Sequence, residues 1–363
     1  MQIADNNQNP KTIIHKIAAI DLYCGAGGLT RGLLDIGIDV LCGIDSDGKC
    51  RQTYETNNIR ENGSPSEFIS MKIEDVQAEF INNIFSESGA DRFMLAGCAP
   101  CQPFSKQNRH RDSDTRAVLL QEFARLISEV RPDYVFMENV PEIEKAHSRV
   151  LSYFIKVLKD NGYNYDFKII NAKDYGVPQS RKRFVLVASR HGKISVPFPL
   201  FGKNIPYVSV RDVIGDTAKF PPISAGISTA SYIPNHRSGG LSALNEKRLQ
   251  FTPVDGGDRK NWPDDLILEC HRNTSGYSDT YGRMFWDRPA PTITTRFNSI
   301  TTGRFAHPEQ NRPISLKEGA AIQSFPYDYT FYGNMQDIAR QIGNAVPPKL
   351  AAEINSVFLR FYF

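Results

Sequence analysis

The stretch Ile17-Ala-Ala-Ile-Asp-Leu-Tyr-Cys-Gly-Ala-Gly-Gly-Leu29 decides the fold of this chain. It begins as an apolar run, passes through a glycine-rich turn, and continues into helical spacing that ends near Gly37. This order predicts a buried strand, a turn and a helix. Glycines in such a turn let a ligand approach the backbone, and the helix N-terminus presents free N–H groups. The stretch therefore predicts the first strand–turn–helix unit of a ligand-binding sheet.

The same alternation continues downstream. The apolar runs expected to be strands are 40–44, 93–96, 134–137 and 184–188, and the stretches with helical spacing are 118–130 and 150–158. Strands that alternate with helices are typical of parallel sheets. We therefore predict an α/β fold with a doubly wound, mostly parallel sheet.

The composition and the helical spacing of the sequence change after residue 190. Pro, Gly, Ser and Thr become dense through residue 302, and helical spacing returns only at 316–322 and 349–358. We predict two domains from this change. The domain that contains the expected sheet is predicted over 12–190 and 330–363, and a smaller, loop-rich domain over 191–329.

Composition narrows the class of protein. The chain has 363 residues, of which 40% are hydrophobic and 23% charged, as expected of a folded, soluble protein. No apolar run approaches the roughly 20 residues that span a bilayer, and the N-terminus is polar, so we expect a cytoplasmic protein. Six cysteines do not make a disulfide scaffold. A net charge of +3 is too small to indicate nucleic-acid binding by itself.

An acid follows the second expected strand. Asp45 stands at its end, where a carboxylate can bind ribose hydroxyls. The glycine spacing is G-x-G-G rather than the dinucleotide pattern G-x-G-x-x-G. A nucleoside without phosphates, such as S-adenosylmethionine, suits this acid-rich turn better than a pyrophosphate. The alternative is a glycine-rich turn that binds nothing.

Cys101 follows the run at 93–96, at the sheet edge where ligands bind in α/β proteins. With Cys98 it forms C-x-x-C, which is one pattern of redox pairs. A redox pair normally begins a helix, whereas Gln102-Pro103 is a poor helix start. The other interpretations are that Cys101 is a lone nucleophile, or that it is an inert buried cysteine.

Two further segments carry candidate functional groups. Glu138 ends the strand at 134–137, where a buried carboxylate requires a partner or a ligand. Gln179, Arg181 and Arg183 alternate before the strand at 184–188 and are expected on one face of an extended segment. The alternative for the arginines is a solvated, basic strand entry.

Together these residues resemble the DNA (cytosine-5) methyltransferase family, in its compact prokaryotic type. The resemblance rests on motifs in the family's order: 23–28, Pro100-Cys101-Gln102, 114–119, Glu138-Asn139-Val140, 179–183, Ile322-Gln323-Ser-Phe325-Pro326 and 341–348. They span nearly the whole chain. The resemblance implies the S-adenosylmethionine-dependent methyltransferase fold, with a target-recognition domain over the loop-rich part.

The resemblance also implies roles for individual residues. Cys101 would add to carbon 6 of cytosine as a thiolate, Glu138 would protonate nitrogen 3, Arg183 would hold oxygen 2 and Arg181 would support the neighbouring phosphate or loop. The expected S-adenosylmethionine site is Asp21, Tyr23, Gly25, Ala26, Gly28, Asp45, Asp75, Pro100, Leu119, Asn344 and Val346. The expected DNA contacts are Ser105, Gln107, Arg109, Arg259, Thr294 and Arg296.

Methyl transfer to a flipped-out cytosine in a short sequence of double-stranded DNA is therefore the leading hypothesis. The same chemistry on RNA cytosine is the alternative, followed by a catalytically silent DNA-binding module and a C-x-x-C oxidoreductase. We expect a monomer that requires no metal, and a cognate restriction endonuclease that acts separately. The sequence identifies neither the DNA target nor the base that removes the carbon-5 proton.

Overall fold

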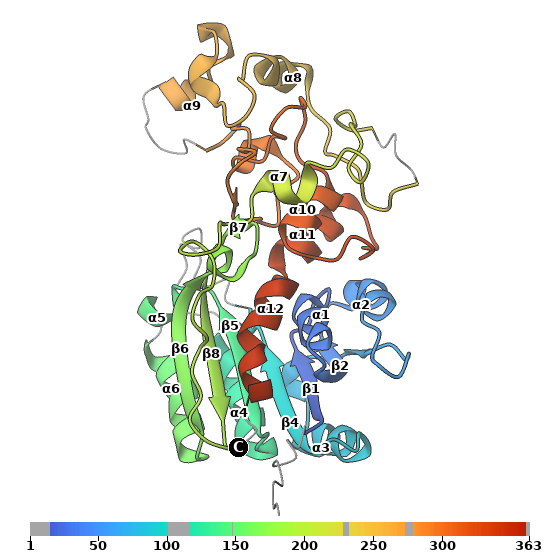
Figure 1. Cartoon of the computed structure of the whole chain (residues 1–363), viewed down its shortest axis with the longest axis vertical. Helices are drawn as coiled ribbons and strands as arrows, with labels where there is room; N and C mark the ends of the chain where they lie inside the picture. Colours follow the sequence, from blue (N-terminus) through green and yellow to red (C-terminus); the bar gives the residue numbers. More distant parts are fainter. Residues whose placement is uncertain (1–14, 101–116, 147, 228–231, 273–278, 361–363) are drawn as a thin grey trace, which may run out of the picture.

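A central sheet organises one half of the molecule (Figure 1). The computed structural model describes residues 15–100, 117–146, 148–227, 232–272 and 279–360. Its sheet has seven strands in the order β3-β2-β1-β4-β5-β8-β6. They are β1 (Ile17–Leu22), β2 (Asp39–Asp45), β3 (Glu67–Ser70), β4 (Arg92–Gly97), β5 (Tyr134–Asn139), β6 (Asn164–Asn171) and β8 (Lys182–Ser189).

All neighbours from β3 to β5 are parallel, and β8 runs antiparallel to both β5 and β6. The strand order reverses direction after β1, so helices cover both faces. This confirms the predicted doubly wound, mostly parallel sheet. The stretch 17–22 forms β1, an interior strand of this sheet, and all six of its residues are buried.

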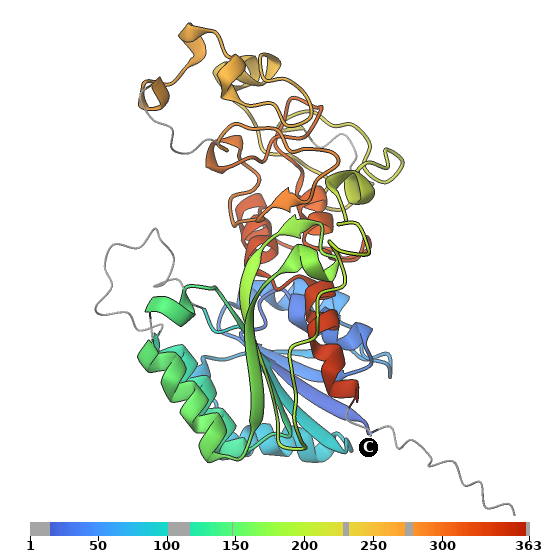
Figure 2. The ribbon, with the colours of Figure 1, turned by 60° about the vertical axis from the view of Figure 1, so that its left-hand side comes forward.

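Each face of the sheet has its own helical layer (Figure 2). One face packs against α3 (Ala78–Glu87), α4 (Ala117–Val130) and α6 (Ser148–Asp160). The other packs against α1 (Gly28–Asp35) and α12 (Pro348–Asn355). The last two helices approach closely, because a Cβ at Gly32 would lie 2.3 Å from the carbonyl oxygen of Pro348. Two shorter helices, α2 (Arg51–Asn57) and α5 (Ile143–Ala146), follow β2 and β5.

The loop-rich half lies beyond the upper edge of the sheet in Figure 1. Its elements are α7 (Val210–Ile214), α8 (Ala243–Gln250), α9 (Glu269–Arg272), α10 (Leu316–Ile322) and α11 (Met335–Asn344), with β7 (Gln179–Ser180) paired to β9 (Ala290–Pro291). One apolar cluster joins α7, α10 and α11. The expected boundary at 329/330 cuts through this cluster, because α11 packs with the loop-rich half whereas α12 packs on α1. The division into two domains stays a prediction.

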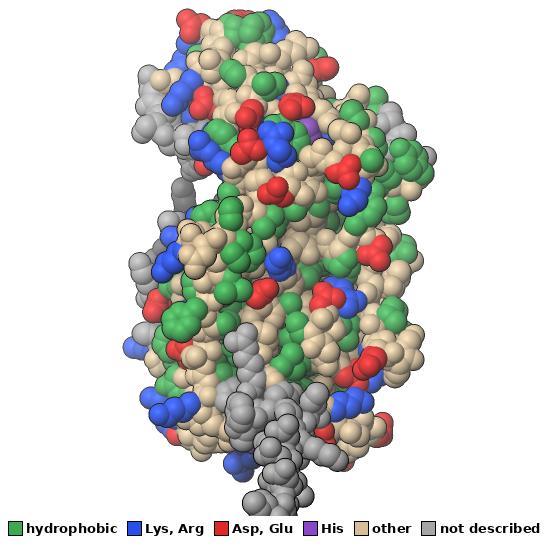
Figure 3. Space-filling model, viewed as in Figure 1, with side chains coloured by type: hydrophobic (Ala, Val, Ile, Leu, Met, Phe, Trp, Pro, Cys, Tyr) green, Lys and Arg blue, Asp and Glu red, His purple; other side chains and the backbone are tan. Residues whose placement is uncertain are grey.

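Charges of both signs are mixed over the surface seen in Figure 3, on the sheet half as on the loop-rich half. This agrees with the small net charge of +3. Within the described residues, the helices are all too short or too polar to cross a bilayer.

Candidate active site

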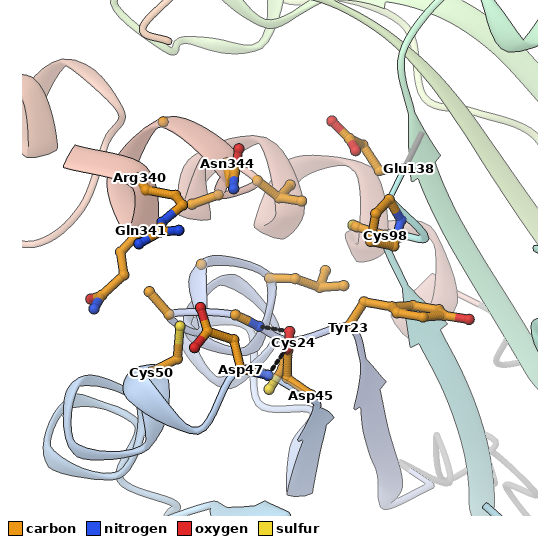
Figure 4. A pocket seen from close by; sticks show the side chains of 18 of the residues that line it. Tyr23, Cys24, Asp45, Asp47, Cys50, Cys98, Glu138, Arg340, Gln341 and Asn344 are labelled. Atoms are coloured by element: carbon orange, nitrogen blue, oxygen red, sulfur yellow. Dashed lines mark hydrogen bonds between the residues drawn. The ribbon is translucent and has the colours of Figure 1, made fainter. Parts of the chain in front are cut away.

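A cavity of about 380 Å³ opens at the carboxyl ends of the parallel strands. It receives residues from the segments that follow β1, β2, β4 and β5, and from the C-terminal end of α11 (Figure 4). The described residues that line it include Asp21, Tyr23, Gly25, Ala26, Gly28, Asp45, Pro100, Glu138, Arg181, Arg183, Asn344 and Val346. This is the edge at which open α/β sheets bind ligands.

The glycine-rich turn and Asp45 form one side of the cavity. The backbone N–H groups of Gly25 and Asp47 donate to the two carboxylate oxygens of Asp45, at 2.9 and 2.8 Å. Burial raises the pKa of Asp45, and these backbone hydrogen bonds oppose the rise. The carboxylate is therefore held in one orientation beside the turn, and it keeps further acceptor capacity for a ligand's hydroxyls.

Asp21 lies under the same turn and is 1% exposed. One of its oxygens accepts a hydrogen bond from the hydroxyl of Thr30 at 2.7 Å, while its Oδ1 has no hydrogen-bond partner among the described residues. Burial raises the pKa of Asp21 to about 7, with a smaller opposing effect from Thr30. The cavity thus contains a carboxyl group that can change its charge near neutral pH.

Glu138 and Arg183 lie on another side of the cavity. The Nε of Arg183 is 2.7 Å from Oε1 of Glu138. That oxygen still lacks a hydrogen bond among the described groups, so the contact is an ion pair without good hydrogen-bond alignment. Figure 4 shows Glu138 across the cavity from Asp45. One edge of a planar heterocycle bound in the cavity could contact both the Glu138 carboxylate and the Arg183 guanidinium.

Arg181 is 3% exposed, and its terminal nitrogens are engaged by the backbone. They donate to the carbonyl oxygens of Ile293 at 3.0 Å and of Gly343 and Ala345 at 3.3 Å. Burial lowers the pKa of Arg181 to about 9, and the charge of Arg183 contributes. Its described contacts therefore fasten the wall of the cavity to the segment around Ile293.

The segment after α11 closes the cavity against the glycine-rich turn. A Cβ at Gly28 would lie 2.3 Å from the carbonyl oxygen of Val346, so glycine is required there for close approach. Val346 enters the lining from this segment, and Asn344 enters it from the last position of α11. Residues from the two ends of the sequence thus form one wall.

Some expected site residues lie elsewhere. Asp75 is exposed at the end of a short 3-10 helix and is absent from the described lining, as are Leu119, Arg259, Thr294 and Arg296. Leu119 lies close by, because its carbonyl oxygen accepts a hydrogen bond from the hydroxyl of Tyr23 at 2.5 Å. The remaining expected residues, Cys101, Ser105, Gln107 and Arg109, lie outside the described residues.

The cavity also contains side chains that were not among the expected site residues. These are Cys24, Asp47, Lys49, Cys50, Asp337, Arg340 and Gln341. Lys49 pairs with Asp337 at 3.3 Å, and Arg340 also pairs with Asp337. The sequence could have indicated two of these side chains, because Asp47 and Gln341 lie close along the chain to the expected site residues Asp45 and Asn344.

The sheet order, the glycine-rich turn after β1 and the acid at the end of β2 are those of an α/β methyltransferase fold. Solved structures share this fold. An E. coli protein described as a DNA modification methyltransferase encoded within a prophage matches with a TM-score of 0.71 and 22% identity, covering 94% of this chain and 98% of that one. The Dnmt2 methyltransferase of S. pombe matches with a TM-score of 0.62 and 17% identity, covering 95% and 98%.

The chain belongs to the C-5 cytosine-specific DNA methylase family, which matches residues 17–359. It is 42% identical over 351 residues to the Type II methylase M.HgiDII of Herpetosiphon aurantiacus, with 95% of each chain covered. It is 31% identical over 350 residues to the Type II methyltransferase M1.HphI of Haemophilus parahaemolyticus, covering 94% of this chain and 86% of that one. The protein is therefore an enzyme, a DNA (cytosine-5-)-methyltransferase, as the sequence predicted.

Proposed function

We propose that this enzyme transfers the methyl group of S-adenosylmethionine to carbon 5 of a cytosine flipped out of a short, specific DNA sequence, through a covalent adduct with Cys101. One observation carries the proposal. A single cavity joins the Asp45 carboxylate and the glycine-rich turn to the Glu138–Arg183 pair, and its lining includes Pro100, the residue that precedes Cys101.

The residues present fit S-adenosylmethionine. Asp45 has acceptor capacity for ribose hydroxyls, and the unpartnered Oδ1 of Asp21 is a buried acceptor under the turn. Acids around the turn suit a cationic sulfonium better than a phosphate. The volume of about 380 Å³ is within the range of small-molecule sites. When bound, the cofactor supplies an electrophilic methyl group.

Cys101 provides covalent catalysis in this proposal. Its thiolate adds to carbon 6 of cytosine, a sulfur–carbon bond forms, and carbon 5 becomes nucleophilic enough to accept the methyl group, whose bond to the cofactor's sulfur would break and leave a neutral thioether. The proton on carbon 5 then leaves, the sulfur–carbon bond breaks, and the thiolate is regenerated. Glu138 protonates nitrogen 3 during the addition, so that negative charge does not accumulate on the ring, and takes this proton back when the sulfur–carbon bond breaks. Arg183 holds oxygen 2.

Cys98 is not the nucleophile in this mechanism. Burial raises the pKa of its thiol well above the ordinary value, and the charge of Glu138 raises it further. A thiol that stays protonated is a poor nucleophile and a poor redox partner.

DNA recognition is assigned to the loop-rich half and to the segment that follows Cys101. The target base must leave the stack to reach the cavity. We propose DNA contacts for Ser105, Gln107, Arg109 and Arg259, and for Thr294 and Arg296 near the cavity wall. The last two are exposed, and the backbone at Thr294 approaches so closely that a Cβ at Gly343 would lie 2.4 Å from it.

The relatives named above are Type II methylases, which supports a restriction–modification role with an endonuclease that acts separately. These relatives and the family concern DNA, so the RNA alternative is not favoured. We further propose a cytoplasmic monomer, and that 191–329 acts as the target-recognition domain.

DNA that carries 5-fluorocytosine tests the chemistry, after bisulfite sequencing of plasmid from expressing cells has located the target. The fluorine cannot leave as a proton does, so an adduct with Cys101 should survive denaturing electrophoresis. Cys101→Ser should form none, yet still bind DNA, because phosphate contacts dominate affinity. Glu138→Gln should react about 100-fold more slowly, at the low end of general-acid contributions. An adduct formed by Cys101→Ser, or full activity of Glu138→Gln, would contradict these assignments.

A further inference from the structure

Residues 329–332, here called the strap, contact the glycine-rich turn but are absent from the described cavity lining. The hydroxyl of Tyr329 donates a hydrogen bond to the backbone carbonyl oxygen of Ala26, inside the turn. The same hydroxyl accepts a hydrogen bond from Nδ2 of Asn58 at 3.1 Å. Tyr329 is 2% exposed and is absent from the described cavity lining, so any effect on a ligand passes through Ala26, which lines the cavity.

Two asparagines fix the strap from opposite sides. On the sheet side, Asn57 accepts from the N–H of Thr330 and donates to its carbonyl oxygen, both at 2.8 Å. On the loop-rich side, Asn235 accepts from the N–H of Phe331 at 2.8 Å and donates to its carbonyl oxygen at 2.9 Å. Consecutive strap residues therefore have both backbone polar groups satisfied, each by one side-chain amide.

The ring of Tyr329 is fixed by packing as well. It contacts Phe325 and Phe331 with ring centroids 4.7 and 5.2 Å apart, and those two rings are 5.0 Å apart. Phe325 reaches the same turn, because a Cβ at Gly28 would lie 3.4 Å from its ring. Removal of the Tyr329 hydroxyl alone would leave this packing in place.

The glycine-rich turn packs so closely on its neighbours that a side chain has no room at Gly27. A Cβ at Gly27 would lie 2.3 Å from Nδ2 of Asn58 and 2.9 Å from the ring of Tyr54. Gly25 and Gly27 have φ values of 51° and 85°, in the left-handed region. Backbone hydrogen bonds from Gly25 to Asp45 and from Gly27 to the carbonyl oxygen of Cys24 hold part of this turn, and the Tyr329 hydroxyl holds the carbonyl group at Ala26.

We propose that Tyr329 is a positioning residue for the cofactor: through Ala26 it holds the glycine-rich turn in its ligand-binding conformation. The strap, bracketed by Asn57 and Asn235, links that turn to the loop-rich half. This inference rests on the proposed S-adenosylmethionine site. It assigns the strap a share in cofactor affinity, although residues 326–336 contribute nothing to the described lining.

The test is Tyr329→Phe, which removes only the hydroxyl. Calorimetric titration with S-adenosylmethionine should give a Kd about 3- to 10-fold higher than that of the unmodified enzyme, the range that one hydrogen bond supports. Fluorescence anisotropy should give a DNA affinity within about twofold of the original, since phosphate contacts dominate that affinity. Tyr327→Phe is the matched control, because the Tyr327 hydroxyl donates to the carbonyl of Lys219 rather than to the turn.

A second variant acts at a distance from the turn. Asn57→Ala removes the sheet-side bracket and should raise the same Kd about 2- to 5-fold, in the range of one weakened hydrogen bond. If Tyr329 only stabilised the fold, Tyr329→Phe would lower the thermal midpoint and leave the Kd of the folded protein for S-adenosylmethionine unchanged. That result would overturn the inference. So would equal Kd changes in Tyr329→Phe and Tyr327→Phe. Failure of the unmodified enzyme to bind S-adenosylmethionine would instead contradict the proposed function.

Discussion

The two halves of this enzyme handle buried charge in different ways. In the sheet half, the core is apolar on both faces, and the deeply buried ionisable groups Asp21, Glu138 and Arg181 all line the cavity. In the described part of the loop-rich half, the buried Asp337 of α11 also lines the cavity, but most buried charged side chains lie away from it: Arg248, Arg283, Arg312, Lys317 and Glu318.

Backbone hydrogen bonding explains the difference. Strands satisfy each other's carbonyl groups, whereas irregular segments leave carbonyl groups that need another donor when buried. Arg283 is 1% exposed and donates to the carbonyl oxygens of Leu249, Thr252, His307 and Gln310 at 2.7 to 3.0 Å. The buried charges of the sheet half therefore gather at the cavity, whereas most of those in the loop-rich half hold irregular backbone in place.

The largest effect should follow the loss of an architectural arginine. Arg283→Met would leave several buried carbonyl groups without donors, and each such group costs about 1–3 kcal/mol. We expect the free energy of unfolding to fall by at least about 3 kcal/mol, measured by urea titration. Arg296→Met, at an exposed position of the same half, should change it by no more than about 0.5 kcal/mol. An unchanged urea midpoint in Arg283→Met would refute the comparison.

Two buried acids should give pH effects of opposite sign. Asp21 has a pKa raised to about 7 by burial, so folding takes up a proton and stability falls as pH rises from about 4 to 7. Burial also opposes the charge of Glu318, but the Arg312 pair at 2.7 Å prevails and its pKa is lowered to about 2. Its stability contribution is present above about pH 4.5 and is lost as pH falls towards 2.

Each unit of pKa shift corresponds to about 1.4 kcal/mol, so either effect amounts to a few kcal/mol at most. Denaturation across pH 3 to 8 should show that Asp21→Asn flattens the neutral side of the profile and Glu318→Gln the acid side. Asp21→Asn should leave the acid side of the profile unchanged, and Glu318→Gln should leave the neutral side unchanged. If Asp21→Asn instead lowered stability at pH 8, the burial argument for this acid would fail.

A smaller effect is expected from the cofactor acid. Asp45→Ala should weaken S-adenosylmethionine binding by about 1–3 kcal/mol, the scale of a charge-assisted hydrogen bond. Calorimetry would measure this, with Asp35→Ala as a surface control on α1. Unchanged affinity in folded Asp45→Ala would contradict the proposal that Asp45 binds the ribose hydroxyls of the cofactor.

The smallest effect should come from Cys98. Its thiol lines the cavity but stays protonated, so Cys98→Ser should retain methyl transfer close to the original rate in a radiolabel assay. A loss equal to that of Cys101→Ser, with both proteins folded, would restore the redox interpretation of C-x-x-C.

The central strands were predictable and the two edge strands were not. The runs that became β1, β2, β4, β5 and β8 are apolar because helices cover both faces of the sheet. The edge strands β3 and β6 have mostly half-exposed or exposed side chains, so they lack the continuous apolar run that identifies a buried strand.

The residue types of the site were predictable, but their partners were not. Glu138 and Arg183 were both candidates, yet only register places them together, because β5 and β8 are antiparallel neighbours. Likewise, Arg181 bonds to carbonyl groups at 293, 343 and 345, more than a hundred residues away along the chain. Backbone partners of this kind have no residue signature, so motif spacing cannot show them.

The close contact between α1 and α12 has a consequence for the synthesis of the enzyme. The glycine-rich turn leaves the ribosome early, whereas the helix that packs on Gly32 and the segment that meets Gly28 come after residue 344. The wall between them can therefore close only when nearly all of the described chain has emerged. A nascent chain stopped at residue 344 would carry every strand of the sheet and still lack the segment that meets Gly28.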